Sequence, residues 1–287
     1  MIALRAPAKI NLCLRVLSRR PDGYHDLESA FQMVGLYDDV TIRSRRSGIA
    51  LTVEGESLPE GPGNLAYDAA AALAREAGGP RGALIRLVKR IPLGAGLGGG
   101  SSDAAAVLIG LNRLWTLRWS RARLAELGAT LGSDVPFFFF GPTAWVTGRG
   151  ERVASAPRWL PSPAGVVPCW AVLANPGFAV STKWAFEALG LTNTRQADKM
   201  PRSLKALPAA PWSIPNDLER VTAATYPVIE EMKTRLLKAG ASVARMSGSG
   251  PTVFGVFATR AEAVNACEGL APSWRRWVVR LLRRAPW

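Results

Sequence analysis

The stretch from Ile91 to Ala106 constrains this chain most, because five of the seven residues from 94 to 100 are glycine. Glycine has no side chain to keep a ligand from the backbone, and it adopts left-handed conformations at little cost. Two serines, an aspartate and three alanines follow, which is typical of a helix start capped by Ser or Asp. We expect a loop that ends at a helix N-terminus, where free N–H groups and the helix dipole favour a phosphate.

Three other kinds of glycine-rich loop fit the stretch less well. A flexible linker rarely has a proline before it and a capped helix after it. The spacing of Gly94, Gly96 and Gly99 matches the dinucleotide-binding pattern, but residues 111–123 contain no acidic residue. A P-loop needs a lysine after its last glycine, where this chain has serine, and the protein-kinase motifs are missing. A phosphate loop of another type remains.

Composition limits the chemistry that this loop can serve. With 287 residues, 48% hydrophobic and 20% charged, the chain has the length of one large or two ordinary globular domains. His25 is the only histidine, which excludes histidine metal clusters and leaves one candidate for a Ser-His pair. Cys13, Cys169 and Cys267 are odd in number and far apart, so we expect free, buried thiols.

The formal net charge of +14 raises the hypothesis of a nucleic-acid partner. The excess is nearly all arginine and is spread along the chain, so we expect no specific nucleic-acid binding. No apolar run approaches the roughly 18 residues of a membrane span, and residues 1–5 do not resemble a signal peptide. We therefore expect a cytoplasmic protein without a membrane partner. We also expect a monomer or a weak dimer.

Lys9 and Asn11 should share one face of an N-terminal strand over residues 3–16, with Ile10 and Leu12 on the other face. The polar face could belong to a site, or it could be an exposed sheet edge, where lysine is common. The sequence alone leaves both interpretations open.

A turn at Pro21-Asp22-Gly23 should present Tyr24 and His25 at a loop tip. A tyrosine beside a neutral imidazole can stack on and hydrogen-bond to a nucleobase. A tyrosine packed under a hairpin beside an exposed histidine explains the same residues equally well.

Asp134 stands before Pro136 and four phenylalanines, at the expected border of a dry core. A desolvated carboxylate there could act as a general base. Aspartate two residues before proline also starts short helices as an N-cap, and the two interpretations are compatible.

Periodicity and turn residues predict further elements along the chain. The strands at 39–45 and 49–53 should form a meander, and helices should end at Gly78, Gly132 and Gly240. Prolines between 156 and 168 indicate a domain boundary, and 191–215 reads as loop. The expected segments are helices at 65–77, 120–132, 227–239 and 260–270, a helix around Trp184 and Phe186, and strands at 83–89, 169–174, 243–246, 253–257 and 277–282. Residues 247–252 read by themselves as an ordinary hairpin turn.

Four motifs together resemble the GHMP kinases, the family of galactokinase and of homoserine, mevalonate and phosphomevalonate kinases. They are Pro-Ala-Lys-Ile-Asn-Leu at 7–12, Arg-Pro-Asp-Gly-Tyr-His at 20–25, Pro-Leu-Gly-Ala-Gly-Leu-Gly-Gly-Gly-Ser-Ser-Asp-Ala-Ala at 92–105 and Gly-Ser-Asp-Val-Pro-Phe-Phe at 132–138. The small-residue loop at 247–252 comes last, in the family's order. The resemblance covers nearly the whole chain. Asp103, where some relatives carry Asn, is a mild departure.

The resemblance implies an α+β, two-domain GHMP kinase fold with the active site between the domains. Residues 1–160 would form an N-terminal, ATP-binding domain of the ribosomal protein S5 domain 2-like type, and residues 161–287 a C-terminal ferredoxin-like domain. ATP, accompanied by Mg²⁺, would place its phosphates on Pro92, Leu93, Gly94, Ala95, Gly96, Leu97, Gly98, Gly99, Gly100, Ser101 and Ser102. The motifs leave the metal ligands unknown.

The resemblance also implies roles on the acceptor side. Asp134 would take the proton of the substrate hydroxyl, and Lys9 would orient both groups. Tyr24, His25 and Phe186 resemble a cytosine pocket, with Asn11 and Thr182 as polar contacts. The implied substrate is a small-molecule cytidine diphosphate derivative on the non-mevalonate route to isoprenoids. The alternatives are another GHMP kinase, of the homoserine or mevalonate type, and a basic nucleic-acid-binding protein.

Overall fold

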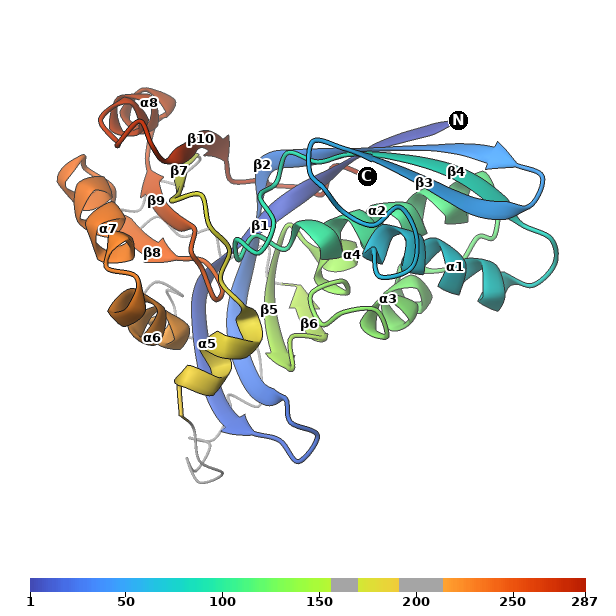
Figure 1. Ribbon diagram of the computed structural model, residues 1–287, viewed down its shortest axis with the longest axis horizontal. Helices are drawn as coiled ribbons and strands as arrows, with labels where there is room; N and C mark the ends of the chain where they lie inside the picture. Colours follow the sequence, from blue (N-terminus) through green and yellow to red (C-terminus); the bar gives the residue numbers. More distant parts are fainter. Residues whose placement is uncertain (156–169, 191–213) are drawn as a thin grey trace.

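The computed structural model describes residues 1–155, 170–190 and 214–287, which form two sheets, each with helices on it (Figure 1). The first sheet has the order β3-β4-β2-β5-β6, and β1 pairs with β2. Its strands are β1 (Ile2–Arg19), β2 (His25–Arg45), β3 (Gly48–Glu54), β4 (Gly82–Val88), β5 (Thr143–Gly148) and β6 (Arg152–Ser155). Its helices are α1 (Leu65–Ala77), α2 (Gly99–Leu114), α3 (Arg121–Ala129) and α4 (Phe137–Phe140).

The second sheet has the order β10-β7-β9-β8, and all its pairings are antiparallel. Its strands are β7 (Trp170–Asn175), β8 (Val243–Met246), β9 (Val253–Phe257) and β10 (Arg275–Arg280). The helices of this half are α5 (Thr182–Ala188), α6 (Asp217–Thr225), α7 (Val228–Lys238) and α8 (Arg260–Glu268). This arrangement confirms the α+β class. The expected boundary between residues 160 and 161 lies outside the described residues.

Local signals predicted several elements to the residue, but the expected meander of strands 39–45 and 49–53 is wrong. The helix over 65–77 and the strands over 243–246 and 253–257 have the expected bounds. In the meander's place, β4 lies between the two strands: it pairs antiparallel with residues 39–45 of β2 and parallel with β3. The connection through α1 returns the chain alongside β3, and such a crossover makes parallel pairing possible.

The helix α6 was not expected from the sequence. It begins after Asn216, whose side-chain oxygen accepts a hydrogen bond from the N–H of Leu218 at 3.0 Å. The apolar signal in this segment is weak, since Leu218, Thr222 and Ala223 are its buried residues. The expected loop at 191–215 falls almost wholly outside the described residues.

The buried apolar residues form three clusters. One fills the space between the first sheet and α1–α4, and another lies between the second sheet and α6–α8. The third joins the halves: Ile10 and Leu12 of β1 pack in one cluster with Leu173 and Phe254 of the second sheet. The alternation along β1 therefore places Lys9 and Asn11 on the face that turns away from this junction.

Cys13 and Cys267 are free thiols, Cys13 buried and Cys267 half-buried, while Cys169 lies outside the described residues. Burial raises the pKa of the Cys13 thiol to about 12, so this thiol is unreactive at neutral pH. None of the helices in the described ranges is long and apolar enough to cross a membrane.

Candidate active site

The glycine-rich stretch connects β4 to α2, as its sequence indicates. Gly98 is the N-cap of α2 with φ of 67°, and in the described part of the chain no side chain caps this helix. The expected Ser or Asp cap is therefore wrong: α2 already begins at Gly99, which places both serines and Asp103 inside its first turns. The glycine start leaves the first N–H groups of the helix available to a ligand.

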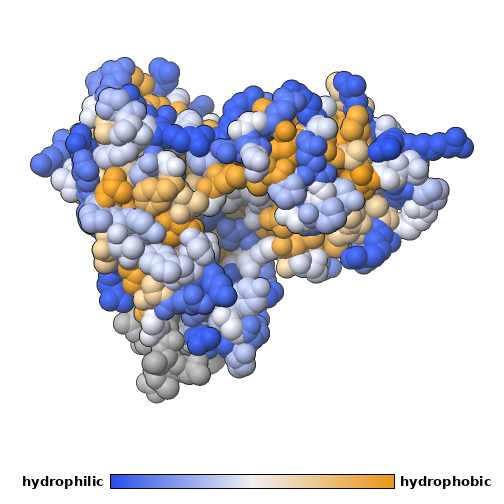
Figure 2. Space-filling view, viewed as in Figure 1, coloured by the Kyte–Doolittle hydropathy of each residue, from blue (hydrophilic) through white to orange (hydrophobic). Residues whose placement is uncertain are grey.

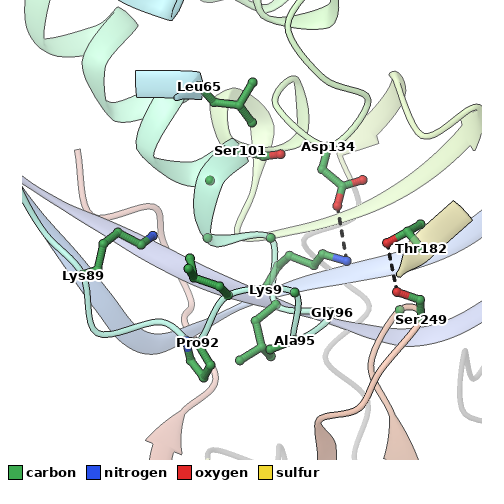
Figure 3. A pocket seen from close by; sticks show the side chains of 17 residues that line it. Lys9, Leu65, Lys89, Pro92, Ala95, Gly96, Ser101, Asp134, Thr182 and Ser249 are labelled. Atoms are coloured by element: carbon green, nitrogen blue, oxygen red, sulfur yellow. Dashed lines mark hydrogen bonds and ion pairs between the residues drawn. The ribbon is translucent and has the colours of Figure 1, made fainter. Parts of the chain in front are cut away.

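A cavity of about 420 Å³ lies at this helix end, where the surface is hollowed between the two halves (Figures 2 and 3). Every predicted phosphate-loop residue from Pro92 to Ser101 lines it. Ser102 does not line the cavity, because its side chain is buried in the protein interior. Its hydroxyl has no hydrogen-bond partner among the described residues. Thr182 lies on the opposite wall, with its hydroxyl 3.0 Å from the Ser249 hydroxyl. The cavity thus has walls from both halves.

The phosphate loop packs directly on the hairpin loop between β8 and β9. The Ser247 hydroxyl donates to the carbonyl of Gly96 at 2.9 Å and accepts from the backbone N–H of Asn11 at 3.2 Å. Residues 247–252 do form a hairpin turn, as expected, but Gly248 and Ser249 also line the cavity. The small side chains at 247–250 could have revealed this role in the sequence, since a close backbone approach requires them.

Lys9 lies at the floor of the cavity, with 4% of its surface exposed. Its ammonium group donates to Asn11 Oδ1 at 2.6 Å, lies 3.3 Å from Asp134 Oδ2 and stands 4.5 Å from the centre of the Phe31 ring. Asn11 in turn donates from Nδ2 to the Ser29 hydroxyl at 3.0 Å. The exposed-edge interpretation of this face is therefore wrong, because a buried lysine held by three groups has a fixed direction.

Asp134 projects from the turn before α4 and points at Lys9 across the cavity (Figure 3). The N-cap interpretation is wrong, since Pro136 occupies the N-cap of α4 without a side-chain hydrogen bond. The expected dry environment is also only partly realised: 30% of the Asp134 side chain is exposed. A carboxylate beside an ammonium group at a cavity wall can accept a proton from a hydroxyl that enters the cavity.

A second cavity of about 120 Å³ shares Lys9 and Asp134 with the first as lining residues. Its lining includes Asn11, His25 and Phe186 among the predicted residues. The His25 and Phe186 rings are stacked, with centroids 4.9 Å apart and an interplanar angle of 18°. This stack joins β2 of the first half to α5 of the second, which gives the cavity an aromatic wall.

The geometry separates two predicted acceptor residues from the other three: Thr182 lines only the larger cavity, and Tyr24 lines neither. Tyr24 does not line either cavity, and 54% of its surface is exposed. The Arg149 guanidinium carbon lies 4.8 Å from the centre of its ring, and Arg149 does line the smaller cavity. Burial, together with the charge of Arg19, lowers the pKa of His25, so this imidazole is neutral at pH 7 and offers one donor and one acceptor.

Four lining residues of the larger cavity were missed by sequence reasoning: Leu65, Lys89, Gly248 and Ser249. Leu65 begins α1 and Lys89 directly follows β4, and both elements carry ordinary apolar patterns, so the sequence context contains no site signal. Arg149 was likewise missed in the smaller cavity.

Both halves of the chain match known family models. Residues 64–142 match the model "GHMP kinases N terminal domain", and residues 199–274 match "GHMP kinases C terminal". The 4-diphosphocytidyl-2-C-methyl-D-erythritol kinase of Geobacter metallireducens is 48% identical over 97% of both chains. That of Geobacter sulfurreducens is 45% identical over 98% of this chain and 99% of its own.

Solved structures agree in fold. A crystal structure of 4-(cytidine 5'-diphospho)-2C-methyl-D-erythritol kinase has a TM-score of 0.78 and 37% identity, and the match covers 98% of this chain and 99% of that one. A homoserine kinase from Cytophaga hutchinsonii has a TM-score of 0.73 at 20% identity over 99% and 96%, which bears on the fold alone. Taken with the glycine loop at the cavity and the family models in both halves, these relatives show that the chain belongs to the GHMP kinases, a family of ATP-dependent small-molecule kinases.

Proposed function

We propose that this chain transfers the terminal phosphoryl group of ATP to the 2-hydroxyl of 4-diphosphocytidyl-2-C-methyl-D-erythritol. The observation that carries the proposal is the position of Lys9 and Asp134, which line both cavities. A donor in one cavity and an acceptor in the other would meet at this pair. The names of the Geobacter relatives supply the identity of the acceptor.

On the donor side, the phosphates would lie on the loop from Pro92 to Ser101, against the free N–H groups at the start of α2. Mg²⁺ would neutralise part of the phosphate charge when bound. The described residues contain no group of three His, Cys, Asp or Glu side chains that could hold a metal ion. This fits an ion held mainly by phosphate oxygens, which is how Mg²⁺ commonly binds with nucleotides.

At the junction of the cavities, Asp134 would accept the hydroxyl proton as the oxygen attacks. Lys9 would hold the carboxylate in place through their 3.3 Å ion pair and offset negative charge on the transferring group. Asn11 keeps the ammonium direction through its 2.6 Å hydrogen bond. Phosphoryl transfer depends mainly on such positioning and charge stabilisation.

On the acceptor side, the cytosine would stack at the His25–Phe186 wall, and neutral His25 would hydrogen-bond to its edge. With ring centroids 4.9 Å apart, no base fits between these two rings as they stand. The base would stack on the outer face of the pair or part the rings, and the exposed Tyr24 is free to cover it. Asn11 would make a polar contact with substrate in this cavity, and Thr182 would make one from the wall of the larger cavity.

The remaining expectations belong to the same proposal. We propose two domains that divide near residue 160, a cytoplasmic location, a monomer or weak dimer, and no specific nucleic-acid partner. One apolar cluster belongs to the first sheet and its helices, and another consists of the second sheet and its helices with Leu14 and Val16 of β1, which supports two folding units packed on β1.

The decisive assay follows ADP formation from Mg-ATP with 4-diphosphocytidyl-2-C-methyl-D-erythritol, and in parallel with homoserine or mevalonate. ADP formation with the cytidyl substrate alone is expected. Excess EDTA should abolish it, and added Mg²⁺ should restore it. Formation with homoserine or mevalonate instead would identify another GHMP activity, and tight, salt-sensitive RNA binding without ADP would favour the nucleic-acid alternative.

His25→Ala should raise KM for the cytidyl substrate by roughly 5- to 150-fold, the equivalent of the 1–3 kcal/mol that stacking a base on an aromatic ring supplies. KM for ATP should stay near the wild-type value, because His25 lines only the smaller cavity. Steady-state kinetics with each substrate varied in turn measure both constants. An equal loss for the two substrates would argue against a base pocket at this wall.

A further inference from the structure

Three buried charged groups lie beneath the phosphate loop. Lys89, the residue after β4, forms ion pairs with Asp38 of β2 and with Asp103 of α2, the latter at 2.7 Å. All three side chains are no more than 3% exposed. Asp38 Oδ1 also accepts a hydrogen bond from the N–H of Ile91 at 2.9 Å. The cluster therefore ties the entry of the loop, through Asp38 and Lys89, to the helix at its exit, through Asp103.

The charges in this cluster do not balance when all its members are ionised. Two carboxylates share one ammonium group, which leaves one net negative charge away from water. Asp103 Oδ1 is buried and has no hydrogen-bond partner among the described residues. Burial, with a further contribution from the Asp38 charge, raises the pKa of Asp103 to about 7, although Lys89 acts in the opposite direction.

The cluster also reaches the cavity. Lys89 lines it, and a Cβ added to Gly99, the first residue of α2, would lie 3.2 Å from Lys89 Nζ. The charged groups that face Asp103 are Lys89 and Asp38, while α1, which packs on α2, presents Leu65 to the cavity. Phosphates on the loop would therefore add negative charge above a cluster that already carries one excess negative charge.

We propose that Asp103 takes up a proton when nucleotide binds at this loop. Asp103 is then a positioning residue, because its protonation removes the excess negative charge that lies under the bound phosphates. A protonated Asp103 leaves Lys89 paired with Asp38 alone and removes the excess negative charge. The neutral carboxyl of Asp103 can still accept the Lys89 hydrogen bond through its carbonyl oxygen, so the two ends of the loop stay joined. This inference rests on the proposed binding of ATP at the loop.

Linkage fixes the sign of the effect. Bound phosphates favour the protonated form of Asp103, so binding takes up protons and affinity falls as pH rises. If nucleotide binds about tenfold more tightly when Asp103 is protonated, and the pKa of Asp103 is about 7 without nucleotide, uptake at pH 7.5 is about half a proton and affinity weakens about sixfold between pH 6.5 and 8.5.

Calorimetric titration of the full chain with a non-hydrolysable ATP analogue tests the inference directly. The titration uses excess Mg²⁺, so that the nucleotide itself carries no titrating proton, and no acceptor is added. Observed binding enthalpy is plotted against the ionisation enthalpy of several buffers at pH 7.5, and the slope gives the protons taken up. We expect about half a proton for the wild type at pH 7.5 and almost none at pH 9.5.

The variant Asp103→Asn should still bind the analogue, with a slope near zero and an affinity that no longer depends on pH in this range. The matched control is Asp39→Asn, beside Asp38 on β2, whose carboxylate pairs with Arg90 at 2.6 Å on the surface. It should keep the wild-type slope.

Each other outcome is informative. Absence of binding by the wild type would overturn the phosphate-loop assignment in the proposed function. Binding by the wild type with no proton uptake at pH 7.5 would overturn the present inference and leave the proposed function intact. An unchanged slope in Asp103→Asn would exclude Asp103 as the group that takes the proton. If that variant fails to fold, the wild-type slopes at pH 7.5 and 9.5 still decide whether a proton is taken up.

Discussion

Asp134→Asn is expected to lower kcat for ADP formation by about 10²- to 10⁴-fold, the usual contribution of a general base. The amide keeps the shape of the carboxylate but cannot accept the hydroxyl proton. The cost in stability should stay below about 1 kcal/mol, because the pair with Lys9 is partly open to water and Lys9 keeps its bond to Asn11. KM for ATP should change little. Steady-state kinetics and a thermal melt measure these quantities.

The matched control is Asp26→Asn, at the start of β2 on the acceptor side. Its carboxylate pairs with Arg20 at 2.9 Å, outside both cavities, so kcat should be nearly unchanged. Near-full activity of Asp134→Asn would remove Asp134 as the base. A similar loss in the control would mean that general electrostatics, rather than proton transfer, explains the result.

Gly96→Ala should lower kcat/KM for ATP by about 100-fold, the scale expected when catalytic groups are misplaced by about 1 Å. A Cβ at this position would lie 2.0 Å from the backbone oxygen of Ser247, a distance that forces the phosphate loop and the β8–β9 hairpin apart. Residue 96 also has φ of 73°, which costs an L-residue about 1–3 kcal/mol. Kinetics with varied ATP and a denaturant unfolding curve separate the two effects.

Gly48→Ala is the control for backbone strain alone. Gly48 has nearly the same φ, 75°, but a Cβ there meets nothing within 4 Å. This variant should lose a similar amount of stability from strain and keep wild-type kinetics. If Gly48→Ala and Gly96→Ala lose equal activity, contact between the loop and the hairpin is not needed for ATP use.

Short-range signals predicted a large part of the fold. The helix over 65–77 has an alanine-rich interior, an Asn64 cap and a terminating Gly78, all readable within a few residues. The strand β8 and the face shared by Lys9 and Asn11 were readable for the same reason, since alternation along a strand is local. The weakly patterned α6 was missed because its burial depends on β1, α5 and α7, which only the tertiary fold brings beside it.

Long-range pairing could not be predicted in this way. The strand β4 lies between β2 and β3 because the crossover through α1 brings it there, and nothing in the two flanking strands requires it. The family resemblance named Tyr24 with His25 and Phe186, yet Tyr24 stands outside both cavities. Ser102, the residue before the Asp103 departure, turns into the core.

By itself, the sequence determined that this chain has a glycine-rich loop at a helix start, and its motifs indicated a GHMP kinase. Backbone freedom and helix initiation are properties of a few adjacent residues, so they can be read locally. Only the tertiary structure decided that Lys9 faces Asp134 between two cavities, and that Lys89 is shared by two carboxylates under the loop. These contacts join residues far apart in the chain. The reactivity of each charged group depends on its burial and on the groups that packing brings beside it.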